Sequence, residues 1–208
     1  MANLYAPSGF QAGRPWDGRA PNFGAPAGVI AYNYASKIAE GDPVFQFTDG
    51  TIRLYVAGGT TIRGIFRGCK YYDPVTQRTQ FYPQWPAPTT LPTNAYVEAY
   101  VDNDPLYTFR CQVQGGPVTQ ANVGQNIDIV AASSGAPNWA GRSVCGLNFG
   151  AIGNGATLPF RIVSVVGYPG NLLAGPSGPN ALYDPTQANN WVEVTLNTSD
   201  ITTRTGQA

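Results

Sequence analysis

Short β-prone runs separated by turn residues are the feature that most limits the folds open to this chain. No segment keeps the apolar period of an amphipathic helix over about 11 residues or more. Instead, runs of about five to eight residues rich in β-branched and aromatic side chains recur between clusters of Gly, Pro, Asn and Asp. This pattern predicts an all-β fold, an antiparallel β barrel or sandwich with long irregular loops.

Two pairs of these runs are predicted to form hairpins. Asp49-Gly50 separates residues 43–48 from 51–57, and this dipeptide is a strong hairpin signal. Residues 95–101 and 106–113 each alternate apolar and polar side chains, and the turn-forming Asp102-Asn103-Asp104-Pro105 lies between them. Further strands are expected at 29–35, 62–66, 69–72, 127–131, 144–149, 157–166 and 191–196.

Residues 1–28 are predicted to form an extended arm ahead of a single β domain at 29–208. Gly and Pro recur there every two or three residues, a spacing that blocks both helix and strand. Aromatic and arginine side chains are spaced along it, and a fully solvated linker rarely carries such anchors. We expect the arm to lie on a neighbouring subunit, the alternative being that it folds back on its own domain. The expected partner contacts are Phe10, Arg14, Trp16, Arg19 and Phe23.

Irregular excursions from the β domain are expected at 73–94 and 167–190, both rich in Pro, Gly and Asn. The first still carries aromatic residues, which indicates a packed loop. Aromatics such as Trp85, Trp139 and Trp191 suit a core or a protein interface, although stacking on sugars is an alternative.

Charge and composition narrow the class of partner. Only 12% of the residues are charged and the formal net charge is zero, without a basic run. Nucleic-acid binding is therefore not expected. No apolar stretch approaches the roughly 18 residues of a membrane span, and no signal peptide is apparent, so we expect a protein made in the cytoplasm. Among the basic residues only Lys37 and Lys70 are lysines; a predominance of arginine favours a contact-rich surface.

Enzymatic chemistry is not expected, and neither a cofactor nor a metal is called for. The chain contains no histidine, which removes the commonest general base and metal ligand. The acidic group at Glu98, Asp102 and Asp104 lacks the remaining ligands of a calcium loop and fits a turn better. The glycine-rich stretch from Gly146 to Gly155 lacks the lysine and spacing of a phosphate loop.

Cysteines are present at positions 69, 111 and 145, too widely spaced for a zinc or redox motif. Cys111 lies within an alternating strand pattern, which predicts a small buried apolar residue, the alternative being a disulfide or a reactive role.

An ordered series of short segments resembles a family of head-associated proteins of tailed bacteriophages, the capsid decoration or cement proteins. The segments are Glu40-Gly41-Asp42-Pro43-Val44; residues 62–73, which lead to Trp85-Pro86; Ala99-Tyr100-Val101-Asp102-Asn103-Asp104-Pro105; 107–112; 123–130; and 158–163. The resemblance covers about residues 29–168. The proline-rich loop at 83–92 and the tail after Gly170 depart from the pattern.

The resemblance implies a structural virion protein on the outer surface of a capsid. Its partners would be the major capsid protein and copies of itself, with a trimer favoured and a dimer as runner-up. Neighbouring capsid subunits would be bridged and the shell stabilised. Two alternatives remain at this point: a glycan-binding β module of a phage tail or fibre, and a tail or head-completion protein.

Overall fold

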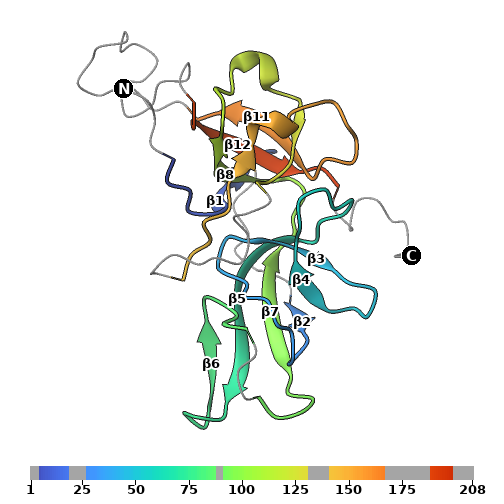
Figure 1. The fold of residues 1–208 in the computed structure, drawn as a ribbon, viewed down its shortest axis with the longest axis vertical. Helices are drawn as coiled ribbons and strands as arrows, with labels where there is room; N and C mark the ends of the chain where they lie inside the picture. Colours follow the sequence, from blue (N-terminus) through green and yellow to red (C-terminus); the bar gives the residue numbers. More distant parts are fainter. Residues whose placement is uncertain (1–4, 19–26, 88–90, 131–140, 167–187, 199–208) are drawn as a thin grey trace, which may run out of the picture.

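The computed structural model describes residues 5–18, 27–87, 91–130, 141–166 and 188–198. Within these ranges the fold is all-β, with strands, two short 3-10 turns and no α-helix. The strands form two separate sheets, which lie one above the other along the longest axis of the molecule (Figure 1). Neither sheet closes on itself, so the predicted sandwich is confirmed and the closed barrel is wrong.

Sheet A, the upper sheet in Figure 1, contains both N-terminal and C-terminal strands. Its order is β1 (Gln11–Pro15), β8 (Tyr107–Gln114), β12 (Trp191–Leu196), β11 (Phe160–Val165) and β9 (Asn126–Ile127). The short β10 (Leu147–Asn148) pairs with β8 in parallel, whereas the other pairs along this order are antiparallel. The 3-10 turns η1 (Gln120–Asn122) and η2 (Phe149–Ala151) precede β9 and follow β10.

Sheet B, the lower sheet, is built around one long strand. Its order is β2 (Ala27–Ile30), β7 (Val97–Asp102), β5 (Gly64–Asp73), β3 (Pro43–Gln46) and β4 (Ile52–Leu54). The later half of β5 pairs with β6 (Arg78–Tyr82) instead of β3. The alternation predicted for the strand at 95–101 is present, because Val97, Ala99 and Val101 are buried and the residues between them face outward.

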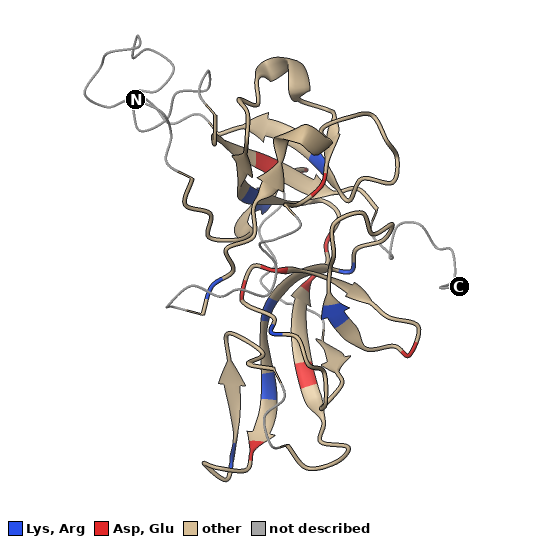
Figure 2. Ribbon diagram, in the orientation of Figure 1, with Lys and Arg blue, Asp and Glu red and all other residues tan. Residues whose placement is uncertain are grey.

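Each sheet carries its own buried apolar cluster. The sheet A cluster includes Phe109, Phe160 and Val194, and the sheet B cluster includes Phe66 and Trp85. Strand β5 serves both, since Ile65 belongs to the sheet A cluster and its neighbour Phe66 to the sheet B cluster. Charged residues are few and of both signs on each sheet (Figure 2), so burial of apolar side chains provides the main stabilisation.

The first predicted hairpin is confirmed and the second is wrong. Strands β3 and β4 pair across Asp49-Gly50, where the Asp49 carboxylate accepts the Thr51 N–H at 2.8 Å. Strands β7 and β8 exist as predicted but belong to different sheets: β7 pairs with β2 and β5, and β8 with β1 and β12. The segment 102–107 is thus a crossing from sheet B to sheet A, because alternation gives the faces of a strand but not its partner.

The N-terminal region is not an extended arm where the structure describes it. Residues 11–15 pair with β8 in sheet A, and residues 27–30 pair with β7 in sheet B. The Ala6 N–H donates to the Gln112 side chain at 2.8 Å, which holds the chain ahead of β1 on sheet A. Over residues 5–18, therefore, the alternative of folding back on its own domain is what the structure shows, and the boundary at residue 28 falls inside β2.

The two predicted excursions have different outcomes. The segment 73–94 contains β6 and the fully buried Trp85, so it is more regular than expected. Most of 167–190 lies outside the described residues.

A buried polar junction at residues 40–43 joins the two sheets. The Gly41 carbonyl accepts the Phe10 N–H at 2.9 Å, and the Glu40 carbonyl accepts the Ser143 N–H at 2.9 Å. The Asp42 carboxylate is fully buried; it accepts the Ala39 N–H at 2.8 Å and the Ser143 hydroxyl. Three distant segments are thereby fixed at one point.

Candidate interaction surfaces

Phe10, the first predicted partner contact, belongs to the protein's own core. Its side chain is buried, and its ring stacks on Phe160 with the centroids 4.5 Å apart. A side chain in this position cannot reach a neighbouring subunit while the domain is folded. The prediction of a partner contact at Phe10 is therefore wrong, because its apolar ring is buried within the sheet A cluster.

Trp16 and Arg14 do lie on the surface, beside a residue that the sequence did not single out. The Trp16 N–H donates to the Leu106 carbonyl at 2.7 Å, which places the two residues side by side at the end of β1. Trp16 is 57% exposed and Leu106 is 43% exposed. We call Arg14, Trp16 and Leu106 the N-terminal patch. Tryptophan and arginine are among the residues enriched in protein interfaces.

Arg14 is only loosely held by the rest of the molecule. Its guanidinium lies 3.7 Å from the Glu193 carboxylate, but the side chain is 76% exposed. Glu193 is buried and has closer partners, the Arg110 guanidinium at 3.1 Å and the Ser164 hydroxyl at 2.9 Å. An exposed ion pair of this kind contributes little to stability, so Arg14 can turn toward a carboxylate on a partner.

The remaining predicted contacts, Arg19 and Phe23, lie outside the described residues. Of the five predicted residues, Arg14 and Trp16 are therefore exposed near the end of β1, whereas Phe10 lies in the interior.

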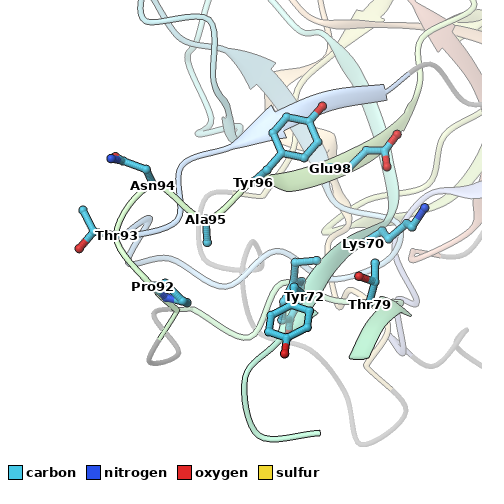
Figure 3. A pocket seen from close by; sticks show the side chains of 10 residues that line it. Lys70, Tyr72, Thr79, Pro92, Thr93, Asn94, Ala95, Tyr96 and Glu98 are labelled. Carbon is cyan, nitrogen blue, oxygen red and sulfur yellow. The ribbon is translucent and has the colours of Figure 1, made fainter. Parts of the chain in front are cut away.

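A second surface lies on the outward face of sheet B. There a pocket of about 470 Å³ opens between strands β5 and β7 and the loop that leads into β7 (Figure 3). Tyr72 and Tyr96, which are 50% and 64% exposed, both line it. Lys70, Thr79 and Glu98 line it from the strands, and the loop lines it from the opposite side (Figure 3). We call this the tyrosine pocket.

The strand wall of the tyrosine pocket is fixed by the pairing of the sheet. Lys70 is directly opposite Glu98 in the pairing of β5 with β7, and Tyr72 is opposite Thr79 in the pairing of β5 with β6. In the loop, a turn closes with a 3.0 Å hydrogen bond from the Ala95 N–H to the Pro92 carbonyl. The strand side of the pocket is therefore set by the pairing of the sheet, and the loop side by a closed turn.

Below this face the strands rest on a layer of aromatic rings. Tyr71 stacks on Tyr82 with centroids 4.7 Å apart and meets the edge of the buried Trp85 at 5.7 Å. Burial raises the pKa of Tyr71 to about 12, so this ring stays neutral near pH 7. Trp85, considered above as a possible sugar platform, is thus a core residue, whereas Trp139 lies outside the described residues.

The acidic group near residue 102 acts as a structural turn. The Asp104 carboxylate accepts the Leu106 N–H at 2.9 Å, and Asp102 binds the Arg67 guanidinium at 2.8 Å. In the part of the chain that the structure describes, no group of three or more His, Cys, Asp or Glu side chains could hold a metal ion. The turn interpretation is the one that these contacts support.

The cysteines are all buried and free, as predicted for Cys111. Burial raises the pKa of the Cys69 thiol to about 12 and also raises the pKa of Cys111. Neither thiol is ionised near pH 7, and the thiolate is the reactive form. These cysteines are core residues.

The sequence did contain a signal for the tyrosine pocket. Tyr96 directly precedes β7 and Glu98 lies on it, in alternation with the buried Val97 and Ala99, and Lys70 and Tyr72 alternate with buried residues along β5. What the sequence could not supply was the pairing of β5 with β7, which brings these four side chains to one face. The N-terminal patch was missed in part for the same reason, since Leu106 joins it only through the pairing of β1 with β8.

No protein-family model, curated protein or solved structure matches this chain. Among the residues that the structure describes, no helix has the length and apolar character needed to cross a membrane.

Proposed function

We propose that this protein is a structural, non-enzymatic component of a tailed-phage virion that binds the outside of the capsid and bridges neighbouring major capsid subunits. The ordered segments between residues 40 and 163 that resemble decoration proteins support this role. Several of these segments coincide with parts of the structure that build or connect the two sheets: the junction at 40–43, strand β5, and the crossing from β7 to β8.

The observation that carries the docking site is the N-terminal patch. Trp16 and Leu106 are hydrogen-bonded neighbours with exposed side chains, and two residues before Trp16 the guanidinium of Arg14 is exposed as well. A buried tryptophan and arginine at the centre of an interface supply a large share of its binding free energy. Repeated binding across a capsid lattice multiplies a modest affinity for one site, and binding only to the assembled shell stabilises it.

Copy number tests the role in the virion. In purified particles, we expect the amount of this protein relative to the major capsid protein to be near one or a simple fraction such as one third. A far smaller ratio would assign it to the tail or to head completion. Its absence from particles would overturn the virion role.

Variants of the patch test the docking site. Trp16→Ala should weaken binding to capsids that lack the protein by about 30-fold or more, the loss typical of an interface hot spot. The matched control is Val75→Ala, an exposed apolar residue on the turn between β5 and β6, remote from the patch. Equal binding by both variants and the wild type would place the contact elsewhere. Size measurements of the free protein test the trimer against the dimer.

A further inference from the structure

We infer that the tyrosine pocket on sheet B is a binding site for a neutral saccharide, independent of the N-terminal patch. Its volume of about 470 Å³ falls within the range of small-molecule sites, roughly 300–1,000 Å³. The two surfaces belong to different sheets, so a molecule docked through the N-terminal patch on sheet A can keep the outward face of sheet B accessible (Figure 1).

Exposed tyrosines are the first reason to choose a saccharide. Tyr72 and Tyr96 stand at the margins of the pocket with half or more of their side-chain surface exposed (Figure 3). An aromatic ring offers a flat apolar face for the C–H groups of a sugar, and a phenol hydroxyl adds a hydrogen bond at its edge. The Tyr72 ring is held on a paired strand, so it loses little conformational entropy when a ligand covers it.

The polar lining is the second reason. Lys70 donates hydrogen bonds, Glu98 accepts them, and Asn94 and Thr79 can do both. Adjacent hydroxyl groups of a sugar are both donors and acceptors, so they suit such a mixed lining. An apolar ligand would leave these groups unpaired.

Charge narrows the class to neutral saccharides. The lining contains one lysine and one glutamate, directly opposite each other on β5 and β7. The carboxylate next to the lysine offsets its attraction for a phosphate or a uronic acid. Nucleotides and acidic polymers are therefore disfavoured, whereas a hexose in a neutral surface polysaccharide meets no uncompensated charge.

The test is binding of the full chain to an array of neutral and acidic fragments of bacterial surface polysaccharides, followed by calorimetric titration of the fragment bound best. We expect a neutral fragment to bind. Tyr96→Ala and Tyr72→Ala should each raise its Kd about tenfold, the loss expected for one aromatic contact of about 1.4 kcal/mol. Both side chains are exposed, so the variants should fold normally.

Two controls separate this site from the rest of the molecule. Tyr96→Phe keeps the ring and loses only the hydroxyl, so it should raise the Kd less than Tyr96→Ala does. Trp16→Ala removes an exposed aromatic outside the pocket and should leave saccharide binding unchanged, even where it abolishes capsid binding. Absence of binding to every fragment would overturn the inference. So would a preference for acidic fragments that depends on Lys70 alone, or binding that survives both tyrosine substitutions.

Discussion

Single buried polar side chains hold separate segments of this chain together, and Asp42 is the clearest case. Its carboxylate is inaccessible to water and binds the Ala39 N–H and the Ser143 hydroxyl. Asp42→Ala leaves both donors buried without this acceptor, at about 1–3 kcal/mol each. We expect the free energy of unfolding in urea to fall by about 2–5 kcal/mol. As a control, Asp104→Asn preserves the capacity for a turn and should stay within about 0.5 kcal/mol; equal effects of the two variants would contradict this role of Asp42.

Buried thiols give the stability of the protein a dependence on alkaline pH. The pKa of Cys69 is raised to about 12 by burial, whereas an exposed thiol in the unfolded chain ionises near about 8.5. A raised pKa means that stability is fully present below about pH 8.5 and is lost as the pH rises toward 12, at about 1.4 kcal/mol per pH unit for each such thiol. Urea unfolding between about pH 8.5 and pH 10 should show Cys69→Ala losing about 2 kcal/mol less than the wild type. Parallel losses in both proteins would exclude Cys69 as a cause.

At the scale of elements, strand β5 depends on a glycine at the point where its register with β7 shifts. The pairing of β5 with β7 shifts register between Phe66 and Gly68, and Gly68 has a φ of 141°. A Cβ there would lie 2.3 Å from the Phe81 ring and 2.7 Å from the Tyr82 carbonyl oxygen. Gly68→Ala therefore combines backbone strain with a clash inside the sheet.

We expect Gly68→Ala to lower the free energy of unfolding by about 3 kcal/mol or more. Gly50→Ala is the matched control, because Gly50 also has a positive φ, 82°, but its Cβ would meet nothing within 4 Å. It should cost only about 1 kcal/mol, the backbone strain alone. Thermal melts of the two variants measure the difference, and equal melting temperatures would show that the clash at position 68 adds nothing to the backbone strain.

The local sequence pattern located most strands, but it did not identify the strands with which they pair. Alternation at 95–101 and 106–113 located β7 and β8, and Asp49-Gly50 located a real hairpin. The same alternation suggested that β7 and β8 pair with each other, although they lie in different sheets. Strand β1 was missed because Gly13 and Pro15 interrupt it; an edge strand tolerates both residues, since only one of its sides is paired. Strand β6 was missed because proline-rich sequence surrounds it.

For the whole molecule, the contacts between the sheets predict that sheets A and B unfold as one unit. Phe10 packs in the sheet A cluster and donates its N–H to Gly41. In the same way, the Gly58 N–H donates to the Asp128 carboxylate at 2.7 Å, and the Ile62 N–H to the Thr198 carbonyl at 3.0 Å. These contacts tie the segment between β4 and β5 to residues near the strands of sheet A, so loss of one sheet exposes apolar surface of the other.

Phe10→Ala tests whether the two sheets unfold together. It also tests whether the N-terminal segment stabilises both sheets or sheet A alone. Removing the ring leaves a cavity against Phe160, which should cost about 3–5 kcal/mol. Native-state hydrogen exchange should show protection falling by the same amount in β7 of sheet B and in β12 of sheet A, because both open only through global unfolding. Trp16→Ala should change neither, since its side chain lies on the surface. Loss of protection in β12 with β7 unaffected would mean that the sheets are independent folding units, and the N-terminal segment would then stabilise sheet A alone.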